Sequence, residues 1–186
     1  MVFHTPISKV LVVKKTLLDK MKPPPYPNFP NISDEKIVLR EIQAFDINDL
    51  IEISFYDAVQ ATTVEQATEM QNKVNKDYSD GNSIHWGITD KLTNTIMGTC
   101  GYYRGFNKEE GELGCVLLPQ YRGQGYMTSA MLLAIEFGLK TMKLKRIWAI
   151  TTQDNTKAIK LFERLNFIKV ADINNNDVEY ELRLIS

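Results

Sequence analysis

The stretch that decides the fold runs from Glu112 to Thr128 and reads Glu-Leu-Gly-Cys-Val-Leu-Leu-Pro-Gln-Tyr-Arg-Gly-Gln-Gly-Tyr-Met-Thr. Its first part, Leu113 to Leu118, is almost entirely apolar and stops at Pro119, which is typical of a buried strand. A turn with two glycines follows, and apolar residues then occupy most sides of a predicted helix from Tyr126 to Met142. This order predicts an anion-binding site, because the first amides of a helix have no intrahelical partner.

Two familiar nucleotide-binding loops do not fit this turn. A Walker loop requires Lys and then Ser or Thr after its last glycine, whereas Gly125 is followed by Tyr126 and Met127. A dinucleotide fingerprint requires a third glycine or alanine three positions on, where the chain has Thr128. On the glycines alone, a helix start that binds nothing stays open as an alternative.

The turn resembles the acyl-CoA loop of the GCN5-related N-acetyltransferases (GNAT), whose pattern is Gln/Arg-x-x-Gly-x-Gly/Ala. The chain has Arg122-Gly-Gln-Gly-Tyr-Met127. The wider run resembles the RimJ/RimL-type branch, which acetylates N-termini of ribosomal proteins and various small amines, and Met127 fits that branch. A second run, Asn155 to Phe167, resembles the family motif Asn-x-x-Ala/Ser-x-x-Leu-Tyr-x-x-x-Gly-Phe, with Phe162 in place of tyrosine and Asn166 in place of glycine.

The patterns along the chain predict an α/β (α+β) fold with a GNAT-like mixed central sheet in the order β-α-α-β-β-β-α-β-α-β-β. The expected strands are 36–42, 83–90, 95–103, 113–118, 146–151, 167–173 and 178–184, and the expected helices are 48–54, 64–78, 126–142 and 155–165. The apolar middle of Arg146–Thr151 predicts an interior strand parallel to Leu113–Leu118. We expect Asp46 to cap the first helix and Asn166 to adopt a left-handed conformation.

The chain length of 186 residues suggests one domain with a sizeable core. We expect residues 35–186 to form the acetyltransferase domain and residues 1–34 to form an N-terminal extension. Within the extension, Lys9–Lys14 is a candidate extra strand. Pro23–Pro30 must be extended, because proline fixes φ and restrains its predecessor. The proline-rich segment is interpreted as a connector, with a proline-rich ligand motif as the alternative.

The composition is that of an ordinary globular protein, with 44% hydrophobic and 24% charged residues. A net charge of −1 gives no reason to expect binding to nucleic acid or to an anionic membrane. We find neither a secretory signal pattern nor an apolar run of about 18 residues. Cys100 and Cys115 are interpreted as small buried residues in a reducing, cytoplasmic compartment. His4 and His85 lack the Cys/His spacing of a metal site, so none is expected.

The resemblance implies acetyl-CoA as co-substrate and direct transfer of acetyl to a primary amine. It implies that the strand separates from its neighbour beyond Cys115, and that its exposed backbone pairs with the pantetheine arm. Amides of the glycine turn would hold the pyrophosphate, and Asn155 would contact the thioester region or cap the last helix. The expected cofactor-binding residues are Val116, Leu117, Leu118, Arg122, Gly123, Gln124, Gly125, Tyr126, Met127, Thr128, Asn155 and Phe162.

Two residues are candidates for the chemistry. Glu112, at the start of the strand, is the candidate base that removes a proton from the amine, directly or through water. The backbone N–H of Val116 is the candidate donor to the carbonyl oxygen. A solvated strand-end carboxylate is the alternative for Glu112. Phe162 has no proton to give, so the acid that would protonate the thiolate is unassigned.

The acceptor and the assembly stay open. A ribosomal-protein N-terminus is the acceptor that the branch suggests, and a polyamine, an amino acid or an aminoglycoside-like compound are alternatives. Asp172, Asp177 and Glu179 would suit a cationic acceptor. A catalytically inactive acyl-CoA-binding or regulatory domain is a further alternative, because the motif tyrosine is absent. The N-terminal strand would either pair within its own subunit or exchange in a homodimer.

Overall fold

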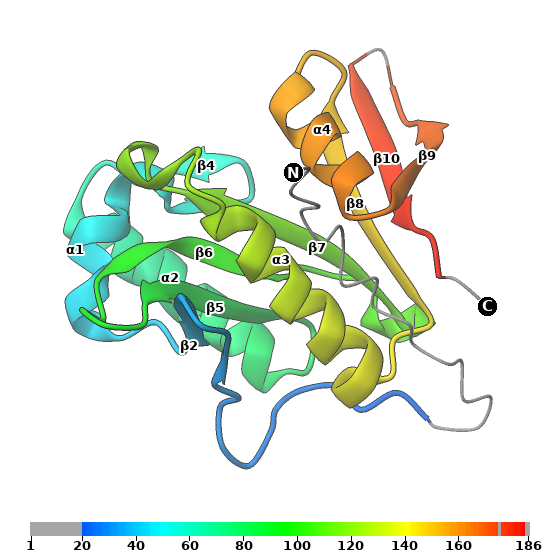
Figure 1. The fold of residues 1–186 in the computed structure, drawn as a ribbon. Helices are drawn as coiled ribbons and strands as arrows, with labels where there is room; N and C mark the ends of the chain where they lie inside the picture. The colour runs from blue at the N-terminus through cyan, green and yellow to red at the C-terminus, as the bar shows by residue number, and fades with distance from the viewer. Residues whose placement is uncertain (1–19, 175, 185–186) are drawn as a thin grey trace, which may run out of the picture.

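A mixed sheet forms the centre of the computed structural model, which describes residues 20–174 and 176–184 (Figure 1). Within these residues the sheet has eight strands in the order β1-β2-β5-β6-β7-β8-β10-β9, and β3 and β4 form a separate hairpin. The strands are β1 Ile32–Ser33, β2 Ile37–Arg40, β3 Phe55–Tyr56, β4 Val59–Gln60, β5 Ile84–Asp90, β6 Ile96–Tyr102, β7 Glu110–Leu117, β8 Arg146–Thr152, β9 Phe167–Asp172 and β10 Asp177–Leu182. The α-helices are α1 Ile47–Leu50, α2 Val64–Ser79, α3 Tyr126–Phe137 and α4 Thr156–Arg164.

The predicted order of elements is confirmed from β2 onward, with two additions. The two-residue strand β1 and the hairpin β3–β4 were not expected from the sequence. The helix predicted over 48–54 is shorter than expected, because α1 ends at Leu50 and a 3-10 turn covers Ile51–Ile53. The helix predicted to Met142 is confirmed as α3 followed by a π-helical turn over Gly138–Met142. The predicted strand Lys9–Lys14 lies outside the described residues.

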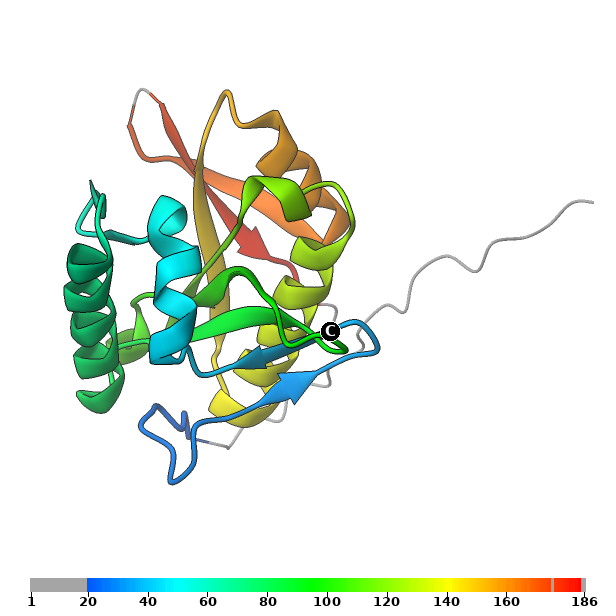
Figure 2. The same ribbon diagram turned by 90° about the vertical axis from the view of Figure 1, so that its left-hand side faces the viewer.

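The helices lie on both faces of the sheet. Figure 2 shows α1 and α2 on one face and α3 on the other. Side chains alternate along a strand, so Leu113 and Leu117 of β7 pack on the α3 face while Val116 joins a smaller apolar cluster on the opposite face. Ala130 and Met131 of α3 are fully buried, as expected for a helix that is apolar on most sides.

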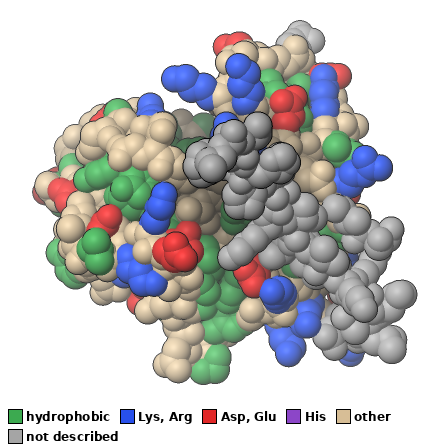
Figure 3. All heavy atoms as spheres, viewed as in Figure 1, with side chains coloured by type: hydrophobic (Ala, Val, Ile, Leu, Met, Phe, Trp, Pro, Cys, Tyr) green, Lys and Arg blue, Asp and Glu red, His purple; other side chains and the backbone are tan. Residues whose placement is uncertain are grey.

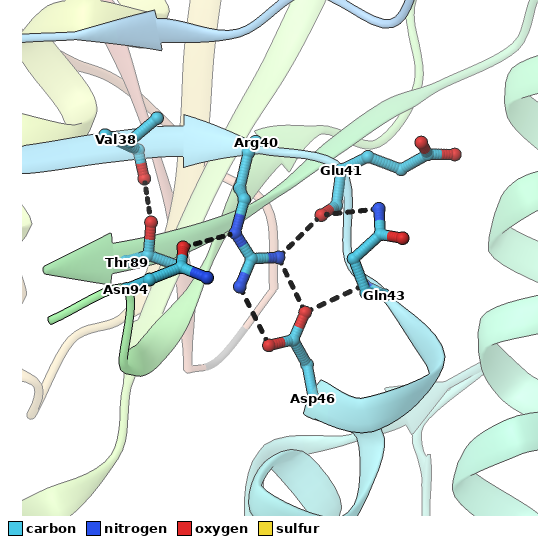
Figure 4. A network of polar contacts seen from close by, with 7 residues as sticks. All are labelled: Val38, Arg40, Glu41, Gln43, Asp46, Thr89 and Asn94. Atoms are coloured by element: carbon cyan, nitrogen blue, oxygen red, sulfur yellow. Dashed lines mark hydrogen bonds and ion pairs between the residues drawn. The ribbon is translucent and has the colours of Figure 1, made fainter. Parts of the chain in front are cut away.

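A buried ion pair fixes the start of the domain (Figure 4). The guanidinium of Arg40, at the end of β2, donates to both oxygens of the Asp46 carboxylate, at 2.6 and 2.9 Å. Asp46 also accepts from the N–H of Gln43 at 2.8 Å, and its side chain is 3% exposed. Asp46 is the N-cap residue of α1, as predicted, but its carboxylate makes no cap bond to this helix, because Arg40 and Gln43 occupy it.

The described part of the N-terminal extension packs against the domain. Residues 20–31 form neither helix nor strand, as the prolines predicted. The N–H of Lys22 donates to the carbonyl of Met142 at 2.7 Å, and the indole of Trp86 donates to the carbonyl of Pro30 at 2.8 Å. The segment thereby connects the end of α3 to the central sheet. Within the described ranges, no helix is long and apolar enough to cross a membrane.

Candidate active site

The strands β7 and β8 separate after a short parallel contact. Their register contains three pairs, of which the last joins Glu112 and Trp148. Beyond it β7 stays antiparallel to β6 as far as Leu117, while β8 pairs with β10 as far as Thr152. Figure 1 shows the two strands diverging. The separation was expected beyond Cys115, and it begins three residues earlier.

Beyond Glu112, the edge of β7 that faces this opening pairs with none of the described strands. Glu112 bonds toward β6, because its carbonyl accepts from the N–H of Tyr103 at 3.0 Å, and the N–H of Leu118 donates to the carbonyl of Met97 at 2.9 Å. Along an antiparallel strand, residues that bond to one neighbour alternate with residues that point to the other side. The amides that face the opening are therefore those of the odd-numbered residues Cys115 and Leu117.

This alternation changes the role expected for Val116. Val116 is paired with Thr99 of β6, in the same alternating set as Glu112 and Leu118. Its N–H therefore points to β6 and not into the opening, which corrects the candidate donor that we named from the sequence. The carbonyl of Leu117, by contrast, accepts from Nε of Arg122 at 3.0 Å, so this carbonyl points away from β6.

The glycine turn before α3 has the properties of an anion site. Gly123 and Gly125 have φ values of +76° and +87°, and a Cβ built on either would meet nothing within 4 Å. Within the described chain, the amides of residues 123–128 donate to no protein group, whereas the N–H of Ser129 donates to the carbonyl of Gly125. The amide of Arg122 already donates to Pro119 at 3.3 Å. The free amides therefore begin at Gly123, and the residues present fit a phosphate group.

Two residues of the second motif, Asn155 and Phe162, differ in their surroundings. Asn155 is the N-cap of α4, where its side-chain oxygen accepts from the N–H of Ala158 at 3.2 Å. The cap role is therefore confirmed, and contact with a cofactor stays a prediction. Phe162 is 6% exposed and packs against the rings of Phe167 and Tyr180. Contact of Phe162 with a cofactor stays a prediction.

Glu112 lies at the point where the two strands part, on the face of the sheet opposite α3. Its side chain is 14% exposed and forms an ion pair with the 65% exposed side chain of Arg104. Burial raises the pKa of Glu112, Arg104 partly offsets this effect, and the negative charge of Glu179 adds to it. The solvated strand-end alternative therefore does not hold. A partly buried carboxylate with a raised pKa is suited to accept a proton from an amine.

Two aromatic residues extend this face of the sheet. The ring of Tyr103 lies directly over Gly114, where a Cβ would be 1.9 Å from a ring carbon, so only glycine allows this approach. Tyr103 also contacts the ring of His85 edge-on, with centroids 4.3 Å apart. Burial lowers the pKa of His85 to about 4, so the imidazole is neutral at neutral pH. The side chain of Tyr103 is exposed at this face.

A charged cluster borders the same face where β7, β8 and β10 run side by side. The guanidinium of Arg146 pairs with the carboxylates of Glu110 at 3.1 Å, Glu181 at 2.6 Å and Glu179. Three carboxylates against one guanidinium leave an excess of negative charge. Figure 3 is viewed from the α3 side, where the surface is indented between the lobe that carries α1 and β4 and the lobe that carries α4 and β10, and the cluster lies on the far side. The excess of carboxylates suits a molecule that carries positive charge.

A family model for the acetyltransferase (GNAT) domain matches residues 36–168, which is more than half of the chain. The chain belongs to the GNAT family of N-acetyltransferases. It is similar to the uncharacterized N-acetyltransferase p20 of Bacillus licheniformis, with 28% identity over 144 residues that cover 73% of this chain and 80% of that protein.

Solved structures of other GNAT enzymes share the fold. The ribosomal-protein-S5-alanine acetyltransferase of Vibrio fischeri superposes with a TM-score of 0.69 at 19% identity, covering 83% of this chain and 97% of the other. The spermidine N-acetyltransferase of Vibrio cholerae superposes with a TM-score of 0.67 at 14% identity, covering 80% and 94%. At these identities the likeness concerns the fold of a GNAT domain and does not identify an acceptor.

Arg104 and Trp148 lie beside Glu112 and were not among the residues expected from the sequence. The alternation along β8 was the available signal, because Ile147 and Ala149 are buried in the core and Trp148 therefore belongs to the other face. The structure brings Glu179 to the site, as we considered for a cationic acceptor. Asp172 and Asp177 lie at the far ends of the β9–β10 hairpin strands.

Proposed function

We propose that this GNAT enzyme transfers an acetyl group from acetyl-CoA to a primary amine on a protein N-terminus. The observation that carries the proposal is the coincidence of two features at one place. An unpaired edge of β7 begins after Glu112, and an open glycine turn with free amides begins α3 six residues after the end of that edge. An amide-rich chain that ends in phosphates matches both features.

Each part of the chain then has a role. The N–H groups of Cys115 and Leu117 face the opening and are placed to bond an extended, amide-containing ligand and a carbonyl oxygen that gains charge. The amides from Gly123 onward hold phosphate oxygens, as the start of a helix does. Bound acetyl-CoA supplies the activated acetyl group as a thioester. Glu112 takes the proton that the amine must lose before its nitrogen carries a lone pair.

The acceptor class is supported by the charge on the face of the sheet that carries Glu112. Glu112 and Trp148 lie side by side on this face and the Arg146 cluster lies next to them, and this arrangement suits an ammonium group. The similarity to a ribosomal-protein-S5-alanine acetyltransferase agrees with the RimJ/RimL-type resemblance. A polyamine is the second candidate, because the excess of carboxylates around Arg146 also suits a polycation. A cytoplasmic location and a homodimer stay predictions.

Release of free CoA thiol tests the proposal directly. The full chain is incubated with acetyl-CoA and, separately, with a peptide that begins with alanine, the same peptide with a blocked N-terminus, and spermidine. We expect thiol release with the free peptide and none above background with the blocked one. Faster turnover of spermidine would favour the second candidate. If the chain binds acetyl-CoA but releases no thiol with any amine, the proposed function is wrong and the protein is an acyl-CoA-binding domain.

A further inference from the structure

The positively charged side chain of Arg104 contacts both Glu112 and Trp148. Its guanidinium pairs with the Glu112 carboxylate, and its central carbon lies 5.7 Å from the centroid of the Trp148 ring. Both partners belong to the last residue pair before β7 and β8 separate. A carboxylate beside an aromatic face is a general binding arrangement for an ammonium group.

Two cations flank the Trp148 ring, and Arg104 is the one that a ligand can displace. Arg146 also approaches the ring, at 5.8 Å, but three carboxylates hold it and its side chain is 26% exposed. Among the described residues Arg104 has one carboxylate partner, and its side chain is 65% exposed. An ion pair with so exposed a partner contributes about 0–1 kcal/mol, so a competing ammonium can displace it at low cost.

Trp148 also has an unused hydrogen-bond donor. Its indole N–H is buried and finds no partner among the described residues. The other tryptophan shows the usual situation, because the indole of Trp86 donates to the carbonyl of Pro30. A buried donor without a partner costs about 1–3 kcal/mol, so a ligand oxygen that reaches it gains affinity. Protonated spermidine has no acceptor atom, whereas a peptide N-terminus carries a carbonyl oxygen on the carbon next to its amine-bearing carbon.

We infer that the ammonium of the acceptor displaces the Arg104 guanidinium from between Glu112 and Trp148, and that the indole N–H of Trp148 bonds the carbonyl oxygen of the acceptor's first residue. Arg104 is then a built-in competitor of the acceptor, and Trp148 selects α-amino acyl groups over polyamines. The inference rests on the proposed function and specifies its acceptor.

Kinetics of three variants test the roles of Arg104 and Trp148. Arg104→Ala removes the competitor, so we expect KM for the alanine peptide to fall about 2–5-fold with little change in kcat. Lys108→Ala is the control, because it removes the same charge from the same β6–β7 connection and leaves Glu112 untouched. Trp148→Phe keeps an aromatic face and loses the N–H, so we expect KM to rise about 5–10-fold for the peptide and to change little for spermidine.

A measurement that needs no turnover separates this inference from the proposed function. The indole N–H signals of the two tryptophans are followed by NMR during titration with the alanine peptide in the presence of CoA, and Trp148→Phe identifies the Trp148 signal. We expect that signal to shift with the peptide and not with spermidine, and the peptide to bind more tightly to Arg104→Ala. An unmoved signal, or equal peptide affinity with and without Arg104, would overturn the inference even in an active enzyme.

Discussion

Glu112 is held where its charge is unfavourable for the folded state. Burial raises its pKa, and the pairing with Arg104 does not fully compensate. A carboxyl group with a raised pKa stabilises the fold below its unfolded pKa, and this contribution is lost as the pH rises through the folded pKa. At neutral pH the ionised Glu112 therefore lowers the free energy of unfolding. Such a charge is expected at a site where it performs chemistry.

Replacement of Glu112 by glutamine should separate chemistry from stability. Glu112→Gln keeps the shape and removes the base, so we expect kcat to fall by about 10²–10⁴-fold while Tm stays equal or rises. In the native enzyme kcat/KM should decline as the pH falls through the raised pKa of Glu112, and the variant should lack this decline. Steady-state kinetics between pH 5 and 9 and a thermal melt provide the measurements. A lower Tm with unchanged kcat would show that the Arg104–Glu112 pair is structural.

At the scale of the element, the turn before α3 is preorganised by its glycines. Gly123 and Gly125 have positive φ, and this backbone directs the first amides of the helix outward. The space beside them is open, since a Cβ at either residue meets nothing within 4 Å. A side chain introduced here disturbs a ligand more than it disturbs the fold.

The variant Gly125→Glu should abolish affinity for acetyl-CoA, because it places a carboxylate where the diphosphate would lie. Gly125→Ala is the matched control, since both variants share the cost of positive φ, about 1–2 kcal/mol, and only one carries the charge. Calorimetric titration with acetyl-CoA measures the affinities, and circular dichroism checks the fold. Equal affinity of the two variants would remove this turn from the proposed cofactor site.

The elements of this fold could largely be predicted because local patterns specify them. The apolar run before Pro119, the glycine turn and the alternation in β9 and β10 each indicated an element that the structure contains. Asn166 has the left-handed conformation expected of it, with φ +66°. The hairpin β3–β4 was missed because its two strands have two residues each and expose Phe55 and Val59, so no buried periodicity marks it.

The site was less predictable, because it depends on which side of a strand each group faces. The sequence placed Glu112 and the turn correctly along the chain, but the direction of the Val116 amide follows from the register of β7 against β6. Trp148 lies beside β7 because β8 pairs with β7 over three residues, and the β6–β7 connection brings Arg104 to the Trp148 ring. Contacts between residues so far apart in the chain leave no pattern in a single sequence.

At the scale of the whole molecule, the sheet consists of two parts with a short junction. One part is β1-β2-β5-β6-β7, and the other is β8-β10-β9 with α4 packed on it. The parallel junction between β7 and β8 contains three residue pairs, from Glu110–Arg146 to Glu112–Trp148. The opening that the proposed cofactor occupies exists because this junction is short. Other interactions must therefore help to hold the two parts together.

Arg146 provides such interactions, because it joins Glu110 of one part to Glu179 and Glu181 of the other. Arg146→Met would leave three neighbouring carboxylates without a counter-charge, and we expect the free energy of unfolding to fall by about 1–3 kcal/mol, less than for a fully buried pair because these groups are partly exposed. Arg146→Lys retains the charge but not the pairing with three carboxylates, so its free energy of unfolding should lie between those of the native chain and of Arg146→Met. Urea unfolding at low and high salt measures the effect, which should shrink as salt screens the repulsion. If Arg146→Met were as stable as the native chain at low salt, β7 and β8 would be held together by their backbone bonds and the apolar core alone.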